Sequence, residues 1–224
     1  MKIINTKDVT TGRFIGLIVG RSGSGKTFQA KLLPNPSEVL VVSAESGLLC
    51  LKGTNIDVAE VKSMEDLRDV YTMLAKGSKY KTIFIDSITE IAEVCLSDLK
   101  HSKEFSDRKM ALAMYGEYND QLTIMIKAFR DLNQYSVIMT CLTAEVQDGL
   151  EIKRELNVPG TKIKNNLKSW MDICLCLEVK EVDGVKQRYF VTDDMISPLA
   201  KDRSGMLDKY EEANIGKVMA RVLA

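Results

Sequence analysis

The stretch VGRSGSGKTFQ at residues 19–29 decides how the rest of the chain is interpreted. Its residues 20–27 fit the pattern G-x-x-x-x-G-K-[ST], and they follow the continuous apolar run FIGLIV at 14–19. Such a run predicts a strand buried on both faces, and KTFQAKLL after the glycines predicts a helix that ends before Pro34. A chance glycine-rich turn is the alternative, but this strand, loop and helix form the context that a phosphate-binding loop requires.

Each part of this loop has a chemical purpose. Glycines let the backbone wrap so that its N–H groups converge on phosphate oxygens, and the helix N-terminus adds a partial positive charge. Lys26 can reach the β- and γ-phosphates, and the Thr27 hydroxyl can ligate Mg²⁺. We therefore expect ATP and Mg²⁺ as ligands. The residues expected to bind the nucleotide here are Gly20, Arg21, Ser22, Gly23, Ser24, Gly25, Lys26, Thr27 and Phe28.

Apolar runs alternate with helical periodicity along the remainder of the chain. The expected strands lie at 39–42, 56–61, 82–86 and 136–141, and the expected helices at 64–76, 89–99, 110–133 and from about 208. Two runs, 173–179 and 187–192, flank the turn Asp183-Gly184 and predict an antiparallel hairpin. The polar segment 147–168 predicts a loop with a short hairpin. The pattern predicts one α/β domain over residues 1–224, with a mostly parallel twisted sheet flanked by helices.

Two acidic residues are candidates for the chemistry around the phosphates. Asp86 ends the apolar run TIFID, where a carboxylate can bind Mg²⁺ together with Thr27. Ser87 follows it where many hydrolytic motors have a glutamate, so the base that activates water must come from elsewhere. Glu45 lies just past the second strand, at the edge where open α/β sheets bind ligands. The alternative is that Glu45 is an ordinary solvent-exposed loop residue. Glu90 is a competing candidate for the base, but we expect its side chain to point away from the nucleotide.

A hydroxyl group near the γ-phosphate is expected from the stretch SVIMTCLTAE. Thr140 or Thr143 could place its hydroxyl there and respond to the phosphate. Simple packing at the end of a strand explains either residue equally well.

The composition places further limits on the function. The chain has 224 residues and a net charge of zero, so a nucleic-acid site would have to be a local basic patch. The five cysteines have no zinc-like spacing and suggest reduced thiols in a cytoplasmic protein. The polar start MKIINTKDVTTG does not resemble a signal peptide, and we expect no membrane partner because no apolar run is long enough to span a bilayer.

These motifs occur in an order that resembles the RecA-like P-loop ATPases. More narrowly, VSAESGL at 42–48, IDSIT at 85–89, KSWMDICLCL at 168–177 and RYFVTDDMISPLAKDRSGML at 188–207 are similar to short phage-encoded nucleotide-binding proteins. That family includes single-strand-annealing recombination proteins. The resemblance covers about residues 12–207 and implies a RecA-like core. It also implies ATP-linked work on single-stranded DNA beside a single-strand-binding protein, in the host cytoplasm if the chain is phage-encoded.

The resemblance also implies residues that act between subunits. RecA-like rings and filaments bury ATP between subunits, where basic residues of a neighbour touch the γ-phosphate. Lys201 and Arg203 in AKDR are similar to the paired K-x-R fingers of related hexameric ATPases, and on an extended segment both would project to one side. A homo-oligomer, either ring or filament, is therefore expected. A solvated charge cluster is the alternative.

In RecA-like proteins, DNA is held by loops that follow the strands after the metal-binding aspartate. The matching segment here, 151–168, has a local surplus of positive charge that suits contacts with phosphates without base specificity. A solvated surface loop is an equally good interpretation. The residues expected to contact DNA are Lys153, Arg154, Lys162, Lys164 and Lys168.

Three functions remain open at this point. The first is a phage RecA-core ATPase that binds single-stranded DNA and promotes annealing or recombination, with hydrolysis that is slow or stimulated by DNA. The second is a P-loop kinase acting on a small molecule or nucleotide, although Glu45 and the late K-x-R segment have no obvious role in a kinase. The third is a scaffold whose assembly is controlled by ATP.

Overall fold

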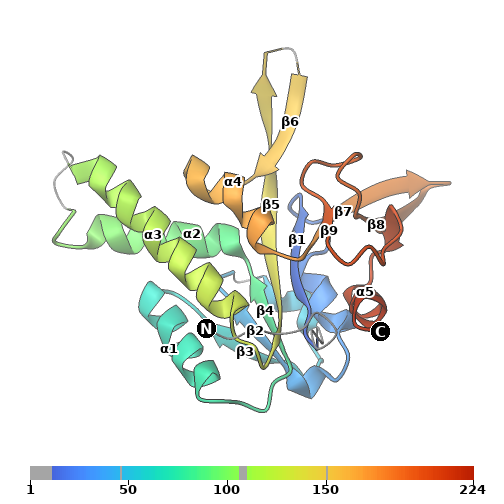
Figure 1. Ribbon diagram of the computed structural model, residues 1–224, viewed down its shortest axis with the longest axis horizontal. Coiled ribbons are helices and arrows are strands. Elements are labelled where there is room, and N and C mark those ends of the chain that lie inside the picture. Colours follow the sequence, from blue (N-terminus) through green and yellow to red (C-terminus); the bar gives the residue numbers. More distant parts are fainter. Residues whose placement is uncertain (1–11, 46, 106–109, 150) are drawn as a thin grey trace, which may run out of the picture.

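The computed structural model of the chain describes residues 12–45, 47–105, 110–149 and 151–224 (Figure 1). The prediction about the start of the chain therefore concerns a segment outside the described residues. The strands are β1 (Ile15–Gly20), β2 (Val39–Ser43), β3 (Asp57–Glu60), β4 (Thr82–Asp86), β5 (Ser136–Asp148), β6 (Glu151–Leu156), β7 (Ile173–Val182), β8 (Val185–Val191), β9 (Lys201–Asp202) and β10 (Tyr210–Glu212). The α-helices are α1 (Met64–Ala75), α2 (Ile88–His101), α3 (Ala111–Arg130), α4 (Thr161–Trp170) and α5 (Ile215–Val222). The 3-10 helices are η2 (Thr27–Leu32), η3 (Pro36–Glu38) and η4 (Leu48–Leu51).

The strands form one sheet in the order β10-β8-β7-β1-β5-β4-β2-β3, with β6 paired to β5 and β9 to β7. Its core from β7 to β3 is parallel, whereas the β5–β6 and β7–β8 pairs are antiparallel. This confirms the α/β class, the mostly parallel sheet and the late hairpin. β5 lies between β1 and β4, with Ile18 opposite Thr140 and Ile85 opposite Met139. The loop after β1 and Asp86 at the end of β4 therefore meet at one edge of the sheet.

Helices cover both faces of the sheet. Successive strand residues point to opposite sides, and in the central strands both sets are apolar. Leu17 and Val19 pack in the cluster that contains the apolar residues of α1, α2, α3 and α4. Ile18 packs in the other cluster, with residues of η2 and α5. Each central strand thus has two apolar faces, which explains its continuous apolar run.

Local signals fixed the start of α1. Ser63 Oγ accepts a hydrogen bond from the backbone N–H of Asp66 at 3.1 Å, and Asp66 Oδ2 accepts one from the N–H of Ser63 at 2.9 Å. This reciprocal capping box was predicted from the sequence, and it satisfies two N–H groups that the helix itself leaves without partners.

The segment after the phosphate loop is shorter and tighter than predicted. It forms the 3-10 helix η2 instead of an α-helix, and Leu33 leaves it in an extended conformation with φ −72° and ψ 146°. The residue before a proline is disfavoured in the α-helical region, so Pro34 ends this segment where the sequence predicted.

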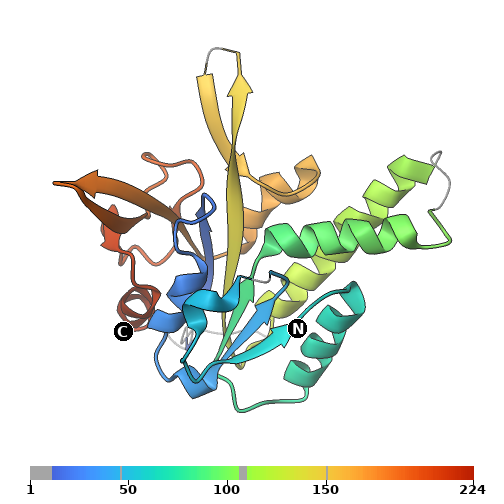
Figure 2. The same cartoon turned by 180° about the vertical axis from the view of Figure 1, so that it is seen from behind.

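The short hairpin predicted within 147–168 is present, but the prediction that the rest of this segment is a loop is wrong. β5 continues to Asp148 and turns back as β6, and α4 follows from Thr161. The helix is polar except for Ile163, Leu167 and Trp170, and the first two lie four residues apart and are both fully buried. The β5–β6 hairpin projects beyond the rest of the sheet (Figures 1 and 2).

The end of the chain also differs from its prediction. Residues 210–212 form β10 against β8, and α5 begins at Ile215, later than the expected start near 208. In the described parts of the chain, no helix has the length and apolar character that a bilayer crossing needs.

Candidate nucleotide site

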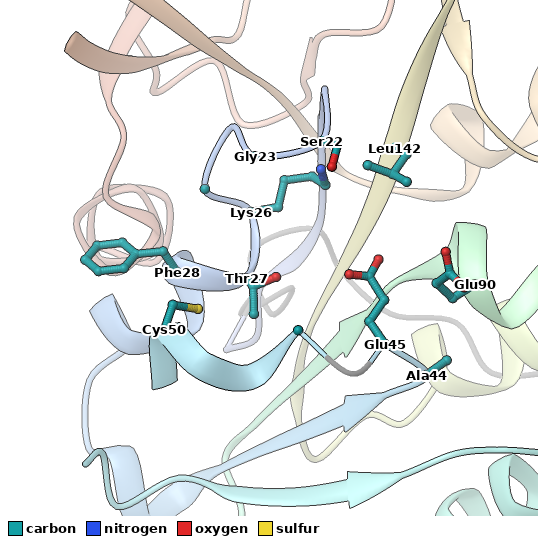
Figure 3. Close-up of a pocket in the computed structure, with 12 residues that line it drawn as sticks. Ser22, Gly23, Lys26, Thr27, Phe28, Ala44, Glu45, Cys50, Glu90 and Leu142 are labelled. Carbon is teal, nitrogen blue, oxygen red and sulfur yellow. The ribbon is translucent and has the colours of Figure 1, made fainter. Parts of the chain in front are cut away.

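A pocket of about 570 Å³ opens at the sheet edge where β1, β2 and β4 end. Figure 3 shows the phosphate-loop residues on one side of it and Glu45 and Glu90 on the other. This is the edge at which open α/β sheets bind ligands. The pocket is lined by Ser22, Gly23, Gly25, Lys26, Thr27, Phe28, Ala44, Glu45, Gly47, Cys50, Glu90 and Leu142.

The phosphate loop has the backbone geometry that its glycines allow. Gly23 and Gly25 have φ angles of +74° and +105°, which side chains with a Cβ rarely adopt. Space is limited as well, since a Cβ on Gly20 would lie 2.9 Å from the backbone oxygen of Leu177. Ser24 Oγ is buried without a hydrogen-bond partner among the described residues. A buried hydroxyl in this position suits a ligand with acceptor oxygens, as a phosphate has.

Lys26 is held inside the loop that it follows. It is only 7% exposed, and its Nζ donates to the carbonyl oxygens of Gly20 at 3.1 Å and Arg21 at 3.0 Å. Burial lowers the pKa of Lys26, while the carboxylates of Asp86 and Glu45 oppose that change. The ammonium group therefore has two neutral partners that the oxygens of a phosphate can replace.

Asp86 is buried and held by two hydroxyl groups. Thr27 Oγ1 donates to Asp86 Oδ2 at 2.6 Å, and Thr140 Oγ1 donates to the other carboxylate oxygen. Thr27 and Asp86 thus present adjacent oxygens, the ligand type that Mg²⁺ prefers. Within the described ranges no group of three or more His, Cys, Asp or Glu residues could hold a metal ion. Magnesium at this position would take its other oxygens from phosphate and water, as nucleotide sites commonly do.

Glu45 lines the pocket, and its carboxylate has a fixed position. Ser87 Oγ donates to Glu45 Oε1 at 2.8 Å. The backbone is held as well. Ser43 Oγ donates to the carbonyl oxygen of Glu45 at 2.7 Å, and the N–H of Ala44 donates to the carbonyl oxygen of Asp86 at 3.0 Å. The carboxylate proposed from sequence as the base therefore lies beside the phosphate loop.

The expectation that Glu90 points away from the site is wrong. Glu90 lines the same pocket as Glu45, and Figure 3 shows both side chains on one side of it. Burial, followed by the charges of Glu45 and Glu93, raises the pKa of Glu90. The first turn of α2 brings Glu90 back over the end of β4, because α2 begins directly after Ser87.

The two candidate threonines have different surroundings. The Thr140 hydroxyl is fully buried and donates to Asp86, so in this structure it holds the metal-binding candidate. Thr143 Oγ1 is also buried but has no hydrogen-bond partner among the described residues. Strand alternation puts Thr143 on the face of Cys141, away from the face of Thr140. A response of either hydroxyl to the γ-phosphate stays a prediction.

Lys201 and Arg203 lie away from the pocket of their own chain. Lys201 pairs with Cys174 near the start of β7, and the neighbouring Ile173 is opposite Gly16 at the start of β1. Lys201 Nζ donates to the carbonyls of the last turn of α4, and Arg203 forms an ion pair with Asp172 at 2.8 Å. A role at the phosphates of a neighbouring subunit stays a prediction.

The predicted DNA-contacting residues are divided between two elements. Lys153 and Arg154 lie on β6, and Lys162, Lys164 and Lys168 lie on α4. Most are engaged with acidic or carbonyl oxygens. These contacts are Arg154 with Glu178, Lys162 with Asp120, Lys164 with Glu155, and Lys168 Nζ with the carbonyl of Pro198.

Sequence reasoning missed two residues that contact the site. Arg188 on β8 donates through Nε to the carbonyl of Ser24 in the phosphate loop. Ser87 was noted only because it is not a glutamate, yet it bonds directly to Glu45. Both contacts join segments far apart in the chain, so periodicity and spacing carry no signal for them.

Comparison with known proteins adds one finding. A family model described as an AAA domain matches residues 14–204. The match includes the phosphate loop, Glu45, Asp86 and the β5–β6 and β7–β8 hairpins. No curated protein matches the chain.

Proposed function

The chain belongs to the AAA domain family, and on this premise we propose that it hydrolyses ATP at the pocket beside the phosphate loop. One observation carries the proposal: Lys26, Thr27 and Glu45 line one pocket, and Thr27 bonds to Asp86. An ammonium group, a metal-binding pair and a carboxylate are the parts that phosphoryl transfer to water needs.

The reaction that suits this arrangement is direct transfer of the γ-phosphoryl group to water. The water oxygen bonds to the γ-phosphorus, the bond to the β–γ bridging oxygen breaks, and ADP leaves with that electron pair. The carboxylate of Glu45 orients the water and accepts its proton, while Lys26 and the loop N–H groups stabilise the negative charge. Mg²⁺ held by Thr27 and Asp86 would supply charge neutralisation at the phosphates.

We further propose that single-stranded DNA is the macromolecular ligand and that the chain promotes annealing or recombination. The resemblance to RecA-like phage proteins is the main support. The projecting β5–β6 hairpin adds to it, since β6 carries Lys153 and Arg154 and an ion pair of Arg21 with Glu145 joins β5 to the phosphate loop. The ion pairs of Lys162 and Lys164 are partly exposed and worth about 0–1 kcal/mol each, so DNA phosphates can compete for these side chains.

The proposed setting is a homo-oligomer in the cytoplasm, acting beside a single-strand-binding protein. Lys201 and Arg203 would contact the nucleotide of a neighbouring copy in such an assembly. The five cysteines are free thiols, which suits a reducing compartment. The partner protein and the form of the assembly rest on the resemblance alone.

The test is ATP hydrolysis with and without single-stranded DNA, at low and moderate salt, with oligomer size measured in parallel. We expect turnover that needs Mg²⁺ and rises with DNA, and a DNA effect that weakens as salt increases. A matched variant separates the two claims. Lys162→Ala together with Lys164→Ala leaves the pocket intact, so basal turnover should persist while DNA stimulation falls.

Other outcomes would redirect the assignment. Turnover that rises with a nucleoside or small acceptor, and not with DNA, would replace the DNA proposal with a kinase. Assembly that depends on ATP without any DNA binding would favour the scaffold. Absence of both ATP binding and hydrolysis would contradict the proposed site itself.

A further inference from the structure

Ser87 occupies the junction between the metal-binding strand and the helix that follows it. It is directly after Asp86 at the end of β4, its side chain is fully buried, and it is the N-cap of α2. Its hydroxyl takes part in two hydrogen bonds. It accepts one from the backbone N–H of Glu90 at 3.3 Å and donates one to Glu45 Oε1 at 2.8 Å.

The Ser87 hydroxyl accepts one of these bonds and donates the other, so its roles toward Glu90 and Glu45 are fixed. A serine hydroxyl has one hydrogen to donate. Because the N–H of Glu90 can only donate to Ser87, the hydroxyl hydrogen is available for the carboxylate of Glu45. The N-terminus of α2 thus orients the donor that holds Glu45.

The contact fixes one carboxylate oxygen of Glu45 and leaves the other available. Among the described residues, Glu45 Oε2 has no hydrogen-bond partner, whereas Oε1 is bonded to Ser87. The Glu45 backbone is already held by Ser43. A carboxylate with one oxygen tethered and one open toward a pocket is arranged to orient a water molecule in a single direction.

We propose that Ser87 is a positioning residue that holds Glu45 in the orientation required to activate the attacking water. The inference rests on the proposed hydrolytic function and adds a second residue to it. It also explains how the site works without a glutamate directly after Asp86. The base, Glu45, comes from the segment after the adjacent strand β2, and the serine that follows Asp86 holds this base in position.

The test compares Ser87→Ala with Ser63→Ala in ATP hydrolysis and nucleotide binding. Ser63 is the matched control because it caps α1 through the same kind of bond, to the N–H of Asp66, and its hydroxyl is not bonded to Glu45. Both variants lose the side chain of a helix N-cap. We expect Ser87→Ala to lower kcat about tenfold with ATP affinity within about twofold, and Ser63→Ala to keep wild-type kcat.

Two further variants test whether a loss of kcat comes from the missing donor and not from a general structural change at this position. Ser87→Thr retains the hydroxyl and should restore most of kcat, while Ser87→Cys has a similar size but only a weak donor and should behave as Ser87→Ala. The Cys variant also serves if the Ala variant does not fold. In a double-mutant cycle, Ser87→Ala should cause no further loss in a Glu45→Gln background, because the base that it orients is already absent.

Failure of the inference and failure of the function have different results. Wild-type hydrolysis with unchanged kcat in Ser87→Ala and Ser87→Cys would overturn the positioning role alone. An equal loss of kcat in the Glu45→Gln background would overturn it as well, since Ser87 would then act independently of Glu45. A wild-type chain that binds ATP without hydrolysing it would overturn both together.

Discussion

Arg188 on β8 donates a hydrogen bond through Nε to the carbonyl oxygen of Ser24 in the phosphate loop, at 2.9 Å. The two residues are 164 positions apart in the chain. The contact attaches the late hairpin to the backbone that would surround a phosphate. Gly25 lies against the same side chain, because a Cβ there would be 3.3 Å from Arg188 Nε.

Replacing Arg188 should therefore weaken nucleotide binding indirectly, because Arg188 contacts the phosphate loop and not the phosphates themselves. We expect Arg188→Ala to raise the dissociation constant for ATP several-fold, because the loop loses a partly exposed hydrogen bond worth about 1 kcal/mol. The measurement is calorimetric titration of ATP. Lys186→Ala on the same strand is the control, and it should bind as the wild type does. Equal affinity in both variants would show that the hairpin does not support the loop.

Lys26→Ala should weaken ATP binding about a hundredfold, because charged hydrogen bonds are worth about 1.5–3 kcal/mol each and Lys26 can address two phosphates. The fold should remain, because the change removes a buried ammonium group whose two bonds are to neutral carbonyl oxygens, so that no bonded charge loses its partner. Binding and turnover of Lys52→Ala, a nearby exposed lysine, provide the reference. Normal turnover in Lys26→Ala would disprove the assigned site.

Thr140→Val and Thr143→Val form a matched pair on β5. Thr140→Val removes the hydroxyl bonded to Asp86 and should destabilise the chain by about 1–3 kcal/mol, because a buried carboxylate oxygen loses its donor. It should also raise the Mg²⁺ concentration needed for half-maximal turnover. Thr143→Val removes a buried hydroxyl that has no described partner, so it should be neutral or stabilising.

Urea unfolding and Mg²⁺ titration of turnover measure both threonine effects. Equal stability loss in the two variants would mean that the bond to Asp86 contributes nothing specific. A wild-type Mg²⁺ requirement in Thr140→Val would show that Asp86 does not depend on this donor for its position.

Arg203→Ala should lower turnover while ATP still binds. The cost in stability should be small, because the ion pair with Asp172 is about half exposed and worth about 0–1 kcal/mol. Mixing the two defective variants, Arg203→Ala and Lys26→Ala, provides the decisive measurement. A Lys26→Ala chain retains Arg203 and can serve the intact pocket of an Arg203→Ala chain, so the mixture should recover turnover if the arginine acts between subunits. A mixture with no more turnover than the two variants have separately would exclude that role.

The raised pKa of Glu90 predicts how stability depends on pH. A carboxyl group with a pKa above its unfolded value binds its proton more strongly in the folded state, so its contribution is present at low pH and is lost as pH rises from about 4.5 through the folded pKa. Glu90→Gln should therefore be more stable than the wild type at neutral pH, with a smaller difference near pH 4.

Unfolding curves between pH 4 and pH 8 test this dependence. Glu181→Gln, which removes an exposed carboxylate from β7, is the matched control. If the stability of Glu90→Gln changes with pH in parallel with that of the wild type, then burial of Glu90 and repulsion by the charge of Glu45 do not contribute to the pH dependence of stability.

Local and repetitive features of the site were predictable from the sequence. The phosphate loop, the buried strand before it and Asp86 at the end of β4 depend on short patterns of apolar residues and glycine. The capping box of Ser63 and Asp66 is equally local. Each of these structures is determined by residues within one or two turns of the chain, so that the sequence carries a direct signal.

Contacts between distant segments were not predictable in the same way. α4 was missed because only Ile163 and Leu167 mark its buried face, and the position of Glu90 was misjudged because α2 begins directly at the end of β4. The bond between Ser87 and Glu45 depends on the pairing of β2 with β4. Periodicity identifies an element, but the neighbour of that element is set by tertiary packing.

The length of β5 has a mechanical consequence. One strand begins between β1 and β4, holds Asp86 through Thr140, and continues without interruption into the hairpin that Glu145 ties to Arg21. From Thr140 to Asp148 it extends roughly 26 Å at about 3.3 Å per residue. A tilt of about 5° at the acidic end would therefore displace the far end by roughly 2 Å. One continuous strand thus connects the hydroxyl that holds Asp86 to the projecting hairpin, so a small change in its direction at one end would be larger at the other.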